Sequence, residues 1–241
     1  MRYSWDFGVV WEGLPFLLHG LALSAALSVL AMVAGSLIGL TVAILRVRRM
    51  RWLAPAGAAY VEFFKNTPLL AQILGVYYAL PVVTGLRLDA FSSALIALSL
   101  NVGAFMSEVL RAGIIGVDRG QSEAASAIGL TEFQSYRRII LPQALLAILP
   151  ACASIWLSLL KDTSVASVIS VAELMYNGRT LAVDTYRPVE IFTVCGALYF
   201  IVVYVQSILL ERAYQAWLAR SRRTVVGRAS IAGRARGGAL P

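Results

Sequence analysis

Charged, amide and hydroxyl side chains interrupt an otherwise apolar chain at three places. They are Asn66, Thr67, Glu108, Arg111, Lys161, Asp162, Thr163 and Ser164. A charged group in a membrane is costly unless it is paired or faces a water-filled cavity, so such residues often mark a solute pathway. We therefore treat all eight as candidates for binding a polar solute during its passage. We identify no catalytic residue and no metal ligand among them.

Each place also has a structural interpretation, which the sequence leaves open. Arg111 follows Glu108 by three residues, so the two side chains can meet on one helix face as a purely structural pair. Segment 161–164 could cap a helix at the outer interface instead of lining a pathway. Segment 65–68 ends in a helix-breaking proline, and such a break can be a structural turn or part of a pathway.

Composition indicates the class of protein. The 241 residues are 59% hydrophobic with a mean hydropathy of +0.74, and 14% are charged, against about 25% in soluble domains. The sequence holds one histidine, and its two cysteines, Cys152 and Cys195, lie in apolar segments, so we expect no metal site. No glycine-rich loop ends in Gly-Lys-Ser or Gly-Lys-Thr, which argues against ATP binding by that route. An intramembrane enzyme would need a nucleophile with a base, or paired catalytic carboxylates, on facing helices. Because the chain has a single histidine, we expect no enzyme.

Five apolar runs are long enough to cross a bilayer, which takes about 20 residues. They cover residues 15–45, 56–83, 90–115, 143–160 and 189–210. The fourth is expected to continue beyond segment 161–164 as a half-helix to about Met175, followed by a polar outer loop at 177–188. Gly35 and Gly39 in the first run have the spacing that allows close helix packing. The predicted fold is an all-α polytopic membrane protein with about five transmembrane helices.

Positive charge predicts the orientation in the membrane. Arg46, Arg48, Arg49 and Arg51 follow the first run, and residues 220–241 hold six arginines and no acidic residue. Because basic segments stay on the cytoplasmic side and near anionic lipid, we expect the N-terminus outside and the C-terminus inside, with no role for nucleic acid. The predicted division is an interfacial segment at 1–13, a transmembrane domain at 14–219 and a disordered basic tail at 220–241.

The stretch 120–142 is the longest polar, helix-competent interval in the middle of the chain. Asp118 with Gln121, and Thr131 with Gln134, have the spacing of capping boxes, so two short helices are expected. Gly129 suits a left-handed stop between them. Pro142 is expected to end the second helix. Such a loop, fixed at both ends to spanning helices, could transmit movement from a cytoplasmic partner.

Three parts of this loop carry a specific resemblance. Glu123-Ala124-Ala125, then Gly129, then Ile139-Ile140-Leu141-Pro142, resemble the EAA loop of ATP-binding-cassette importer permeases throughout its length. Segments 60–70, 120–121, 141–144 and 160–164 are similar to the polar amino acid branch of that family. The resemblance covers roughly residues 14–215.

The resemblance implies a type I importer permease core of the MetI-like kind, working as a pair of identical or paralogous permease subunits in a bacterial cytoplasmic (inner) membrane. A solute-binding protein would deliver a polar amino acid from outside, and a cytoplasmic ATPase dimer would use ATP and Mg, with no cofactor bound by this chain. The EAA loop would couple the chain to the ATPase. The residues carried over to that contact are Gly120, Gln121, Glu123, Ala124, Ala125 and Gly129.

The sequence departs from the branch at two places. Gly103-Ala104-Phe105 stands where Ala-Tyr is common on the third run, and Ser24 or Leu23 replaces a common Thr in the first. For an amino acid substrate, Asp162 and Glu108 could bind the ammonium group. Lys161, Arg111 or backbone donors could bind its carboxylate.

Two alternative functions remain at this point. One is a type I importer for another small solute. The other is an ion-coupled secondary transporter, which internal repeats would indicate. No convincing repeat is visible, and the EAA loop would have no purpose in such a transporter.

Overall fold

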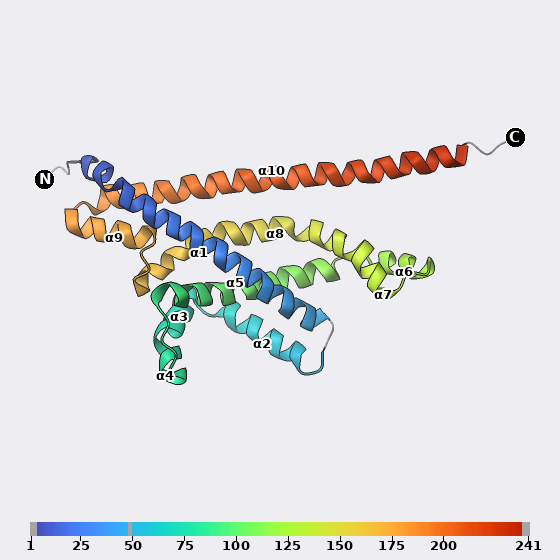
Figure 1. The fold of residues 1–241 in the computed structure, drawn as a ribbon, viewed down its shortest axis with the longest axis horizontal. Helices are drawn as coiled ribbons and strands as arrows, with labels where there is room; N and C mark the ends of the chain where they lie inside the picture. The colour runs from blue at the N-terminus through green and yellow to red at the C-terminus, as the bar shows by residue number, and fades with distance from the viewer. Residues whose placement is uncertain (1–3, 48–49, 238–241) are drawn as a thin grey trace. The chain divides into compact units, whose positions relative to one another are not determined.

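The computed structural model describes residues 4–47 and 50–237, and the chain there is helical with short connections (Figure 1). Arg48 and Arg49 of the basic loop lie outside the described residues. The elements in order are α1 Gly8–Val47, α2 Leu53–Asn66, α3 Leu69–Leu74, the π-helix η1 Gly75–Ala79, α4 Leu80–Thr84, α5 Ala90–Ile115, α6 Arg119–Ala127, α7 Glu132–Ser135, the π-helix η2 Tyr136–Ile140, α8 Leu141–Asp162, the 3-10 helix η3 Thr163–Ile169, α9 Leu174–Thr185 and α10 Pro188–Gly237.

Four of the described helices are long and apolar enough to span a membrane, and the bent α2–α4 segment brings the number to five. The prediction of about five spans is confirmed. The spans divide into two compact units, residues 1–203 and 204–241, with the boundary inside α10. The expected boundary at residue 220 stays a prediction.

Helices α1 and α5 form the centre of the first unit. A Cβ atom on Gly35 would lie 2.7 Å from Val102 Cγ1 and 2.9 Å from the Ser99 carbonyl, and one on Gly39 would lie 2.9 Å from the Gly103 carbonyl. Only glycine permits this approach of the two backbones. The predicted role of the two glycines in helix packing is confirmed.

Helix α5 has the bounds that the third apolar run predicts. Asp89 caps its N-terminus by accepting a hydrogen bond from the Ser92 amide at 2.7 Å. Hydrogen bonds from the Ser92 side chain and amide hold the pKa of Asp89 below its usual range. A polar residue followed by a long apolar run was enough to predict where this helix begins and ends.

The second span breaks where proline was expected to break it. α2 ends at Asn66, and α3 leaves at 111°. The side-chain amide of Gln72 donates to the carbonyls of Phe64 at 2.9 Å and Thr67 at 3.1 Å, and Asn101 donates to the Gln72 side chain at 3.0 Å. Protein groups therefore satisfy the backbone freed by the break.

Two prolines follow π-helices instead of ending helices. The expectation that Pro142 stops the second loop helix is wrong, because η2 leads directly into α8. The Leu141 amide bonds to the Tyr136 carbonyl, and the Leu80 amide before Pro81 bonds to the Gly75 carbonyl in the same way. These wider turns relieve the contact between a proline ring and the preceding turn of an α-helix.

The region after α8 corrects two expectations. Segment 161–164 does not cap a half-helix: α8 runs on to Asp162 and tightens into η3, which ends at the left-handed Ser170. Residues 177–185, expected as a loop, belong to α9, because Glu173 caps that helix through the Tyr176 amide at 2.8 Å. Glu173 lies among apolar residues, so the sequence gives no clear sign that a helix begins there.

Helix extends toward both ends of the described chain. α1 begins at Gly8, and α10 continues through Gly237. The interfacial segment expected at 1–13 and the disordered tail expected at 220–241 stay predictions. Alanine and arginine favour helix, and no proline occurs in the tail before Pro241.

Candidate functional site

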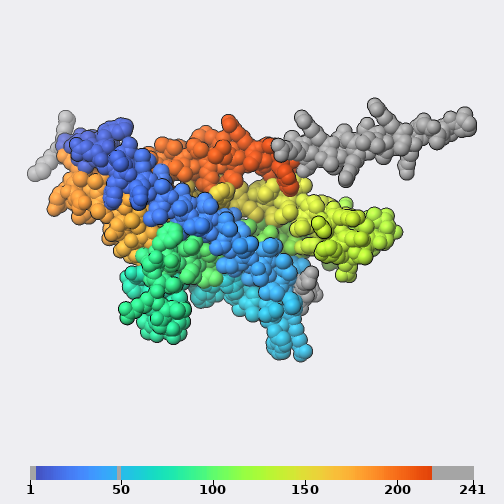
Figure 2. Space-filling model, in the orientation of Figure 1, coloured from blue at the N-terminus to red at the C-terminus, as the bar shows by residue number. Residues whose placement is uncertain are grey.

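The loop between α5 and α8 forms a helical projection. Figure 1 places α9 at one end of the α5–α8 pair and α6 and α7 at the other. Figure 2 shows the surface of the loop, in yellow-green, at the end that holds α6 and α7. Asp118 caps α6 through the Gly120 amide, so this cap is a single bond and not the expected capping box with Gln121. Gln121 instead accepts from Gln143 at 3.3 Å, which ties α6 to the start of α8.

The turn between the two short helices matches expectation. Gly129 has φ +77°, and the expected left-handed stop is confirmed. Thr131 and Gln134 form the second capping box, with bonds of 3.3 and 3.1 Å. The left-handed Gly129 and the capping box at Thr131 both depend on residues a few positions apart, which is why the sequence predicted them.

The residues predicted to contact an ATPase divide by exposure. Gly120, Gln121, Glu123, Ala124 and Gly129 are exposed. Ala125 is 1% exposed and accepts a backbone hydrogen bond from Leu130 at 3.1 Å. Its small side chain packs inside the loop, and the predicted contact of Ala125 with an ATPase stays a prediction. Ile128 and Phe133, which the sequence did not single out, are 73% and 70% exposed beside it.

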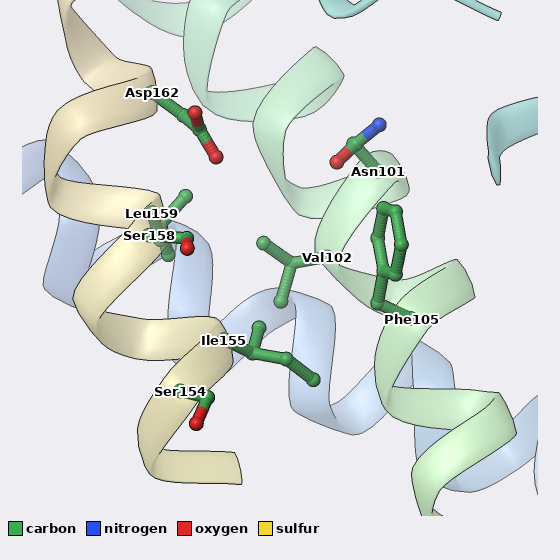
Figure 3. A pocket seen from close by; sticks show the side chains of 8 residues that line it. All are labelled: Asn101, Val102, Phe105, Ser154, Ile155, Ser158, Leu159 and Asp162. Atoms are coloured by element: carbon green, nitrogen blue, oxygen red, sulfur yellow. The ribbon is translucent and has the colours of Figure 1, made fainter. Parts of the chain in front are cut away.

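A cleft of about 400 Å³ lies between α5 and α8 (Figure 3). Its lining residues are Asn101, Val102, Phe105, Ser154, Ile155, Ser158, Leu159 and Asp162. Asp162 and Asn101 enter it from opposite helices. Among residues 4–47 and 50–218, the Asp162 carboxylate accepts no hydrogen bond and forms no ion pair within 4.0 Å.

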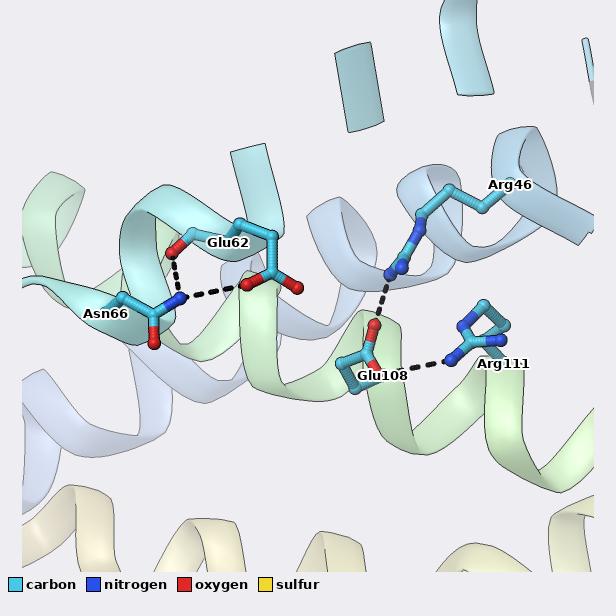
Figure 4. Close-up of polar contacts among 5 residues, drawn as sticks. All are labelled: Arg46, Glu62, Asn66, Glu108 and Arg111. Carbon is cyan, nitrogen blue, oxygen red and sulfur yellow. Dashed lines mark hydrogen bonds and ion pairs between the residues drawn. The ribbon is translucent and has the colours of Figure 1, made fainter. Parts of the chain in front are cut away.

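Glu108 and Arg111 lie elsewhere, in a cluster at the end of α1 (Figure 4). The Glu108 carboxylate accepts from Arg46 at 2.5 Å and from Arg111 at 3.3 Å. The structural pair that spacing allowed is confirmed, and α1 supplies a second arginine from 62 positions away. Both Glu108 oxygens are engaged within the chain, and the predicted binding of an ammonium group by Glu108 stays a prediction.

The remaining candidates are spread along the first unit. Lys161 is exposed, Ser164 is half-buried, and Thr163 is fully buried and donates to the Leu160 carbonyl at 2.7 Å. Asn66 donates to Glu62 at 2.9 Å, and Thr67 donates to the Phe63 carbonyl at 2.8 Å. None of these residues lines the cleft. The side chains of Asn66 and Thr67 at the break are thus bonded within the chain, and both interpretations of the break, a structural turn and part of a pathway, stay predictions.

Sequence reasoning missed several buried polar residues, among them Gln72, which is 7% exposed, and Glu173, which is 0% exposed. Each stands in a run that hydropathy assigns to the membrane or its edge. A buried ionisable residue in such a run is itself a signal of function or pairing.

The described residues hold no group of three or more His, Cys, Asp or Glu side chains that could bind a metal. The site chemistry is that of reversible binding: a carboxylate, an amide and two serine hydroxyls around a cleft. A carboxylate with an open face binds a cationic group through charge-assisted hydrogen bonds.

Residues 35–223 match the family described as "Binding-protein-dependent transport system inner membrane component". The glutamine transport system permease protein GlnP of Escherichia coli K12 is 33% identical over 214 residues, covering 88% of this chain and 96% of the relative. The octopine permease protein OccM of Rhizobium meliloti is 36% identical (82% and 84% covered). The arginine permease protein ArtQ of Bacillus subtilis is 32% identical (85% and 93% covered).

Solved structures agree with this family. A chain from the crystal structure of an amino acid ABC transporter with histidines superposes with a TM-score of 0.84 and is 32% identical, covering 89% of this chain and all of that one. A chain of the inward-facing MetNI methionine ABC transporter has a TM-score of 0.72 at 20% identity, covering 88% and 99%. The second likeness supports the fold alone.

The family excludes the ion-coupled secondary transporter, because its members work with an ATPase and a binding protein. The predicted fold class, a MetI-like importer permease core, is confirmed by the family match and the superpositions. The chain belongs to the inner-membrane components of binding-protein-dependent transport systems and is the permease subunit of an ATP-binding-cassette importer, with ATP hydrolysis in a partner subunit.

Proposed function

We propose that this permease carries a polar amino acid, and that the cleft between α5 and α8 is part of its path. The observation that carries the proposal is the Asp162 carboxylate, which enters the cleft without a hydrogen bond or ion pair within 4.0 Å from the described chain. The named relatives transport glutamine, arginine and octopine, all of which have an amino acid backbone or derive from one. These relatives favour an amino acid over the alternative of another small solute.

The chemistry of the cleft fits one end of a zwitterion. An α-ammonium group can donate to the Asp162 carboxylate, and the Asn101 side chain and the hydroxyls of Ser154 and Ser158 can bond polar atoms nearby. Lys161 or backbone donors remain for the substrate carboxylate. A volume of about 400 Å³ is within the range of small-molecule sites, roughly 300–1,000 Å³.

The exposed face of α6 is the proposed contact with the ATPase. Glu123 and Ala124 are exposed at the end of the unit away from α9. α6 is tied to α8 through Gln121 and Gln143, and α8 carries Asp162 at its other end. A push on α6 therefore has a continuous helical route to the cleft. In this arrangement the partner ATPase dimer binds ATP and Mg, and this chain binds no cofactor.

The orientation and assembly are also proposals. The basic residues after α1 and the α6 loop lie on the cytoplasmic side, which puts the N-terminus outside and the C-terminus inside. A second permease subunit, identical or paralogous, completes the pathway. A solute-binding protein delivers the substrate from outside.

The substrate proposal is tested with the permease assembled with its ATPase and binding protein in proteoliposomes. Radiolabelled glutamine and arginine are the probes. Asp162→Asn should raise the half-saturating concentration roughly 10- to 100-fold, because a hydrogen bond to a charged group contributes about 1.5–3 kcal/mol. Asp184→Asn removes an exposed carboxylate on α9 and should leave uptake unchanged. Unchanged uptake in Asp162→Asn at normal assembly would remove Asp162 from the pathway.

The coupling proposal has a separate readout. Glu123→Lys should abolish amino-acid-stimulated ATP hydrolysis, because it reverses a charge on the exposed face of α6. Asp184→Lys makes the same change at the opposite end and should keep the stimulation. ATP-independent uptake by this chain alone would contradict the whole proposal.

A further inference from the structure

A buried carboxylate joins three helices at the end of the unit opposite α6. Glu173 is 0% exposed and precedes α9. Its Oε1 accepts from the Tyr176 amide at 2.8 Å, and its Oε2 accepts from the Tyr199 hydroxyl of α10 at 2.8 Å. The Ser24 hydroxyl of α1 lies 3.2 Å from Oε2. The carboxylate therefore holds α1, α9 and α10 at one point.

The α1 side of this point is built for close contact. A Cβ atom on Gly20 would lie 2.9 Å from the Glu173 carbonyl and 2.8 Å from the Asn177 side chain. Ser24 accepts from the Leu174 amide at 3.2 Å, and Asn177 donates to the Phe16 carbonyl at 2.8 Å. The packing leaves no room for water beside the carboxylate, so its bonds to protein donors must replace solvation.

The same group is connected to the cleft. The connection runs along the backbone: the Glu173 amide bonds to the Val171 carbonyl at 2.8 Å, and the Val171 amide bonds to the Ala166 carbonyl at 3.3 Å. This route ends in η3, which begins where α8 and Asp162 end.

We propose that Glu173 is a positioning residue of the transport pathway, which acts through the backbone of residues 171–173 and η3 to hold Asp162 in the cleft. The proposal rests on the proposed function of that cleft. Glu173 does not line the cleft and does not touch the substrate. It fixes the place where α8 tightens into η3, and that place determines where the Asp162 carboxylate lies.

The expected consequence concerns affinity. Replacing the carboxylate with an amide at Glu173 puts a donor opposite the Tyr199 hydroxyl and loosens residue 173, whose backbone is bonded to η3 through Val171. A displacement of about 1 Å in a binding group can cost on the order of 10²-fold in function. We expect Glu173→Gln to raise the half-saturating concentration of glutamine or arginine by about 10-fold. Tyr199→Phe, which leaves the carboxylate in place, should change it in the same direction.

The test is a double-mutant cycle of Glu173→Gln and Asp162→Asn in the assembled transporter, with uptake of radiolabelled glutamine and arginine as the readout. If Glu173 acts through Asp162, its substitution should have little further effect once Asp162 is changed. The matched control is Glu190→Gln. Glu190 is also 0% exposed, but it bonds the Asp6 amide at 3.0 Å and Arg187 at 3.5 Å.

Each outcome decides between the two proposals. Equal effects of Glu173→Gln with and without Asp162→Asn, at matched amounts of assembled complex, would overturn the positioning role. The positioning role would also be overturned if Glu173→Gln and Tyr199→Phe both changed the maximal rate of uptake and left the half-saturating concentration unchanged. If Asp162→Asn has no effect by itself, the proposed substrate path fails instead. If Glu173→Gln does not assemble, Tyr199→Phe carries the same cycle.

Discussion

The bend in the second span depends on one side chain that the sequence did not single out. Gln72 donates to the carbonyls of Phe64 and Thr67, and its oxygen accepts from Asn101. We expect Gln72→Met, which keeps the length and unbranched shape of the side chain, to destabilise the first unit strongly. The reason is that methionine offers neither the donors nor the acceptor.

The magnitude follows from the groups left behind. The Thr67 carbonyl loses its Gln72 donor, and one Asn101 donor loses its acceptor, at a site that is 7% exposed. A buried polar group without a partner costs about 1–3 kcal/mol, so the two together cost about 3 kcal/mol. For a chain of this size that corresponds to a fall in Tm of roughly 10 °C.

The assay is thermal unfolding of the purified permease in detergent, followed by loss of helical signal. Asn66→Ala is the matched control, because Asn66 borders the same break but is exposed, and its bonds to Glu62 compete with water. Surface changes of this kind usually stay within about 0.5 kcal/mol. A Tm for Gln72→Met equal to that of the native chain, or to that of Asn66→Ala, would refute the reasoning.

Three further predictions concern other local features. Gly129→Ala should lower stability by about 1 kcal/mol, because φ is +77°, whereas Gly75→Ala, at a helical position with open space, should not; thermal unfolding measures both. Arg46→Ala should cost about 1.5–3 kcal/mol in the same assay, because Glu108 loses a charge-assisted hydrogen bond, and Arg46→Lys should recover only part of it. Asp89 has a lowered pKa in the folded chain, so its contribution is present at neutral pH and is lost as pH falls through that pKa; Asp89→Ala should flatten the acid side of a profile of Tm against pH, and an unchanged profile would contradict the cap.

Local signals predicted the elements that depend on local chemistry. The bounds of α5, the capping box at Thr131, the left-handed Gly129 and the break before Pro68 were all predicted from spacing and residue type. In each case the deciding hydrogen bond or dihedral angle joins residues within a few positions of one another. The signal is therefore complete within a short window.

Elements that depend on partners far along the chain were missed. α9 was expected to be a loop. Its capping residue, Glu173, is held by Ser24 and Tyr199, which lie 149 and 26 positions away, and the sequence does not show that these residues meet. Pro142 was expected to end a helix, because π-helices are rare and give no clear periodicity. The sequence also does not show that Ala125 is buried, because its burial depends on packing of the loop against itself.

The candidate site shows the same division. The EAA loop and the residue Asp162 were predicted from the sequence as isolated segments, and charge in an apolar run was the signal for both. The sequence could not show that Asp162 shares a cleft with Asn101, or that Glu108 is occupied by Arg46 from another helix.

The sequence by itself determined the class of protein, the spans and the family, because hydropathy and a local motif are properties of consecutive residues. Tertiary structure alone decided that Glu108 is paired with Arg46 and Arg111 and that Asp162 enters the cleft between α5 and α8. The physical reason is that the cost of a charge in a membrane depends on what surrounds it. For Asp162, Glu108 and Glu173, those surroundings come from helices far apart in the chain.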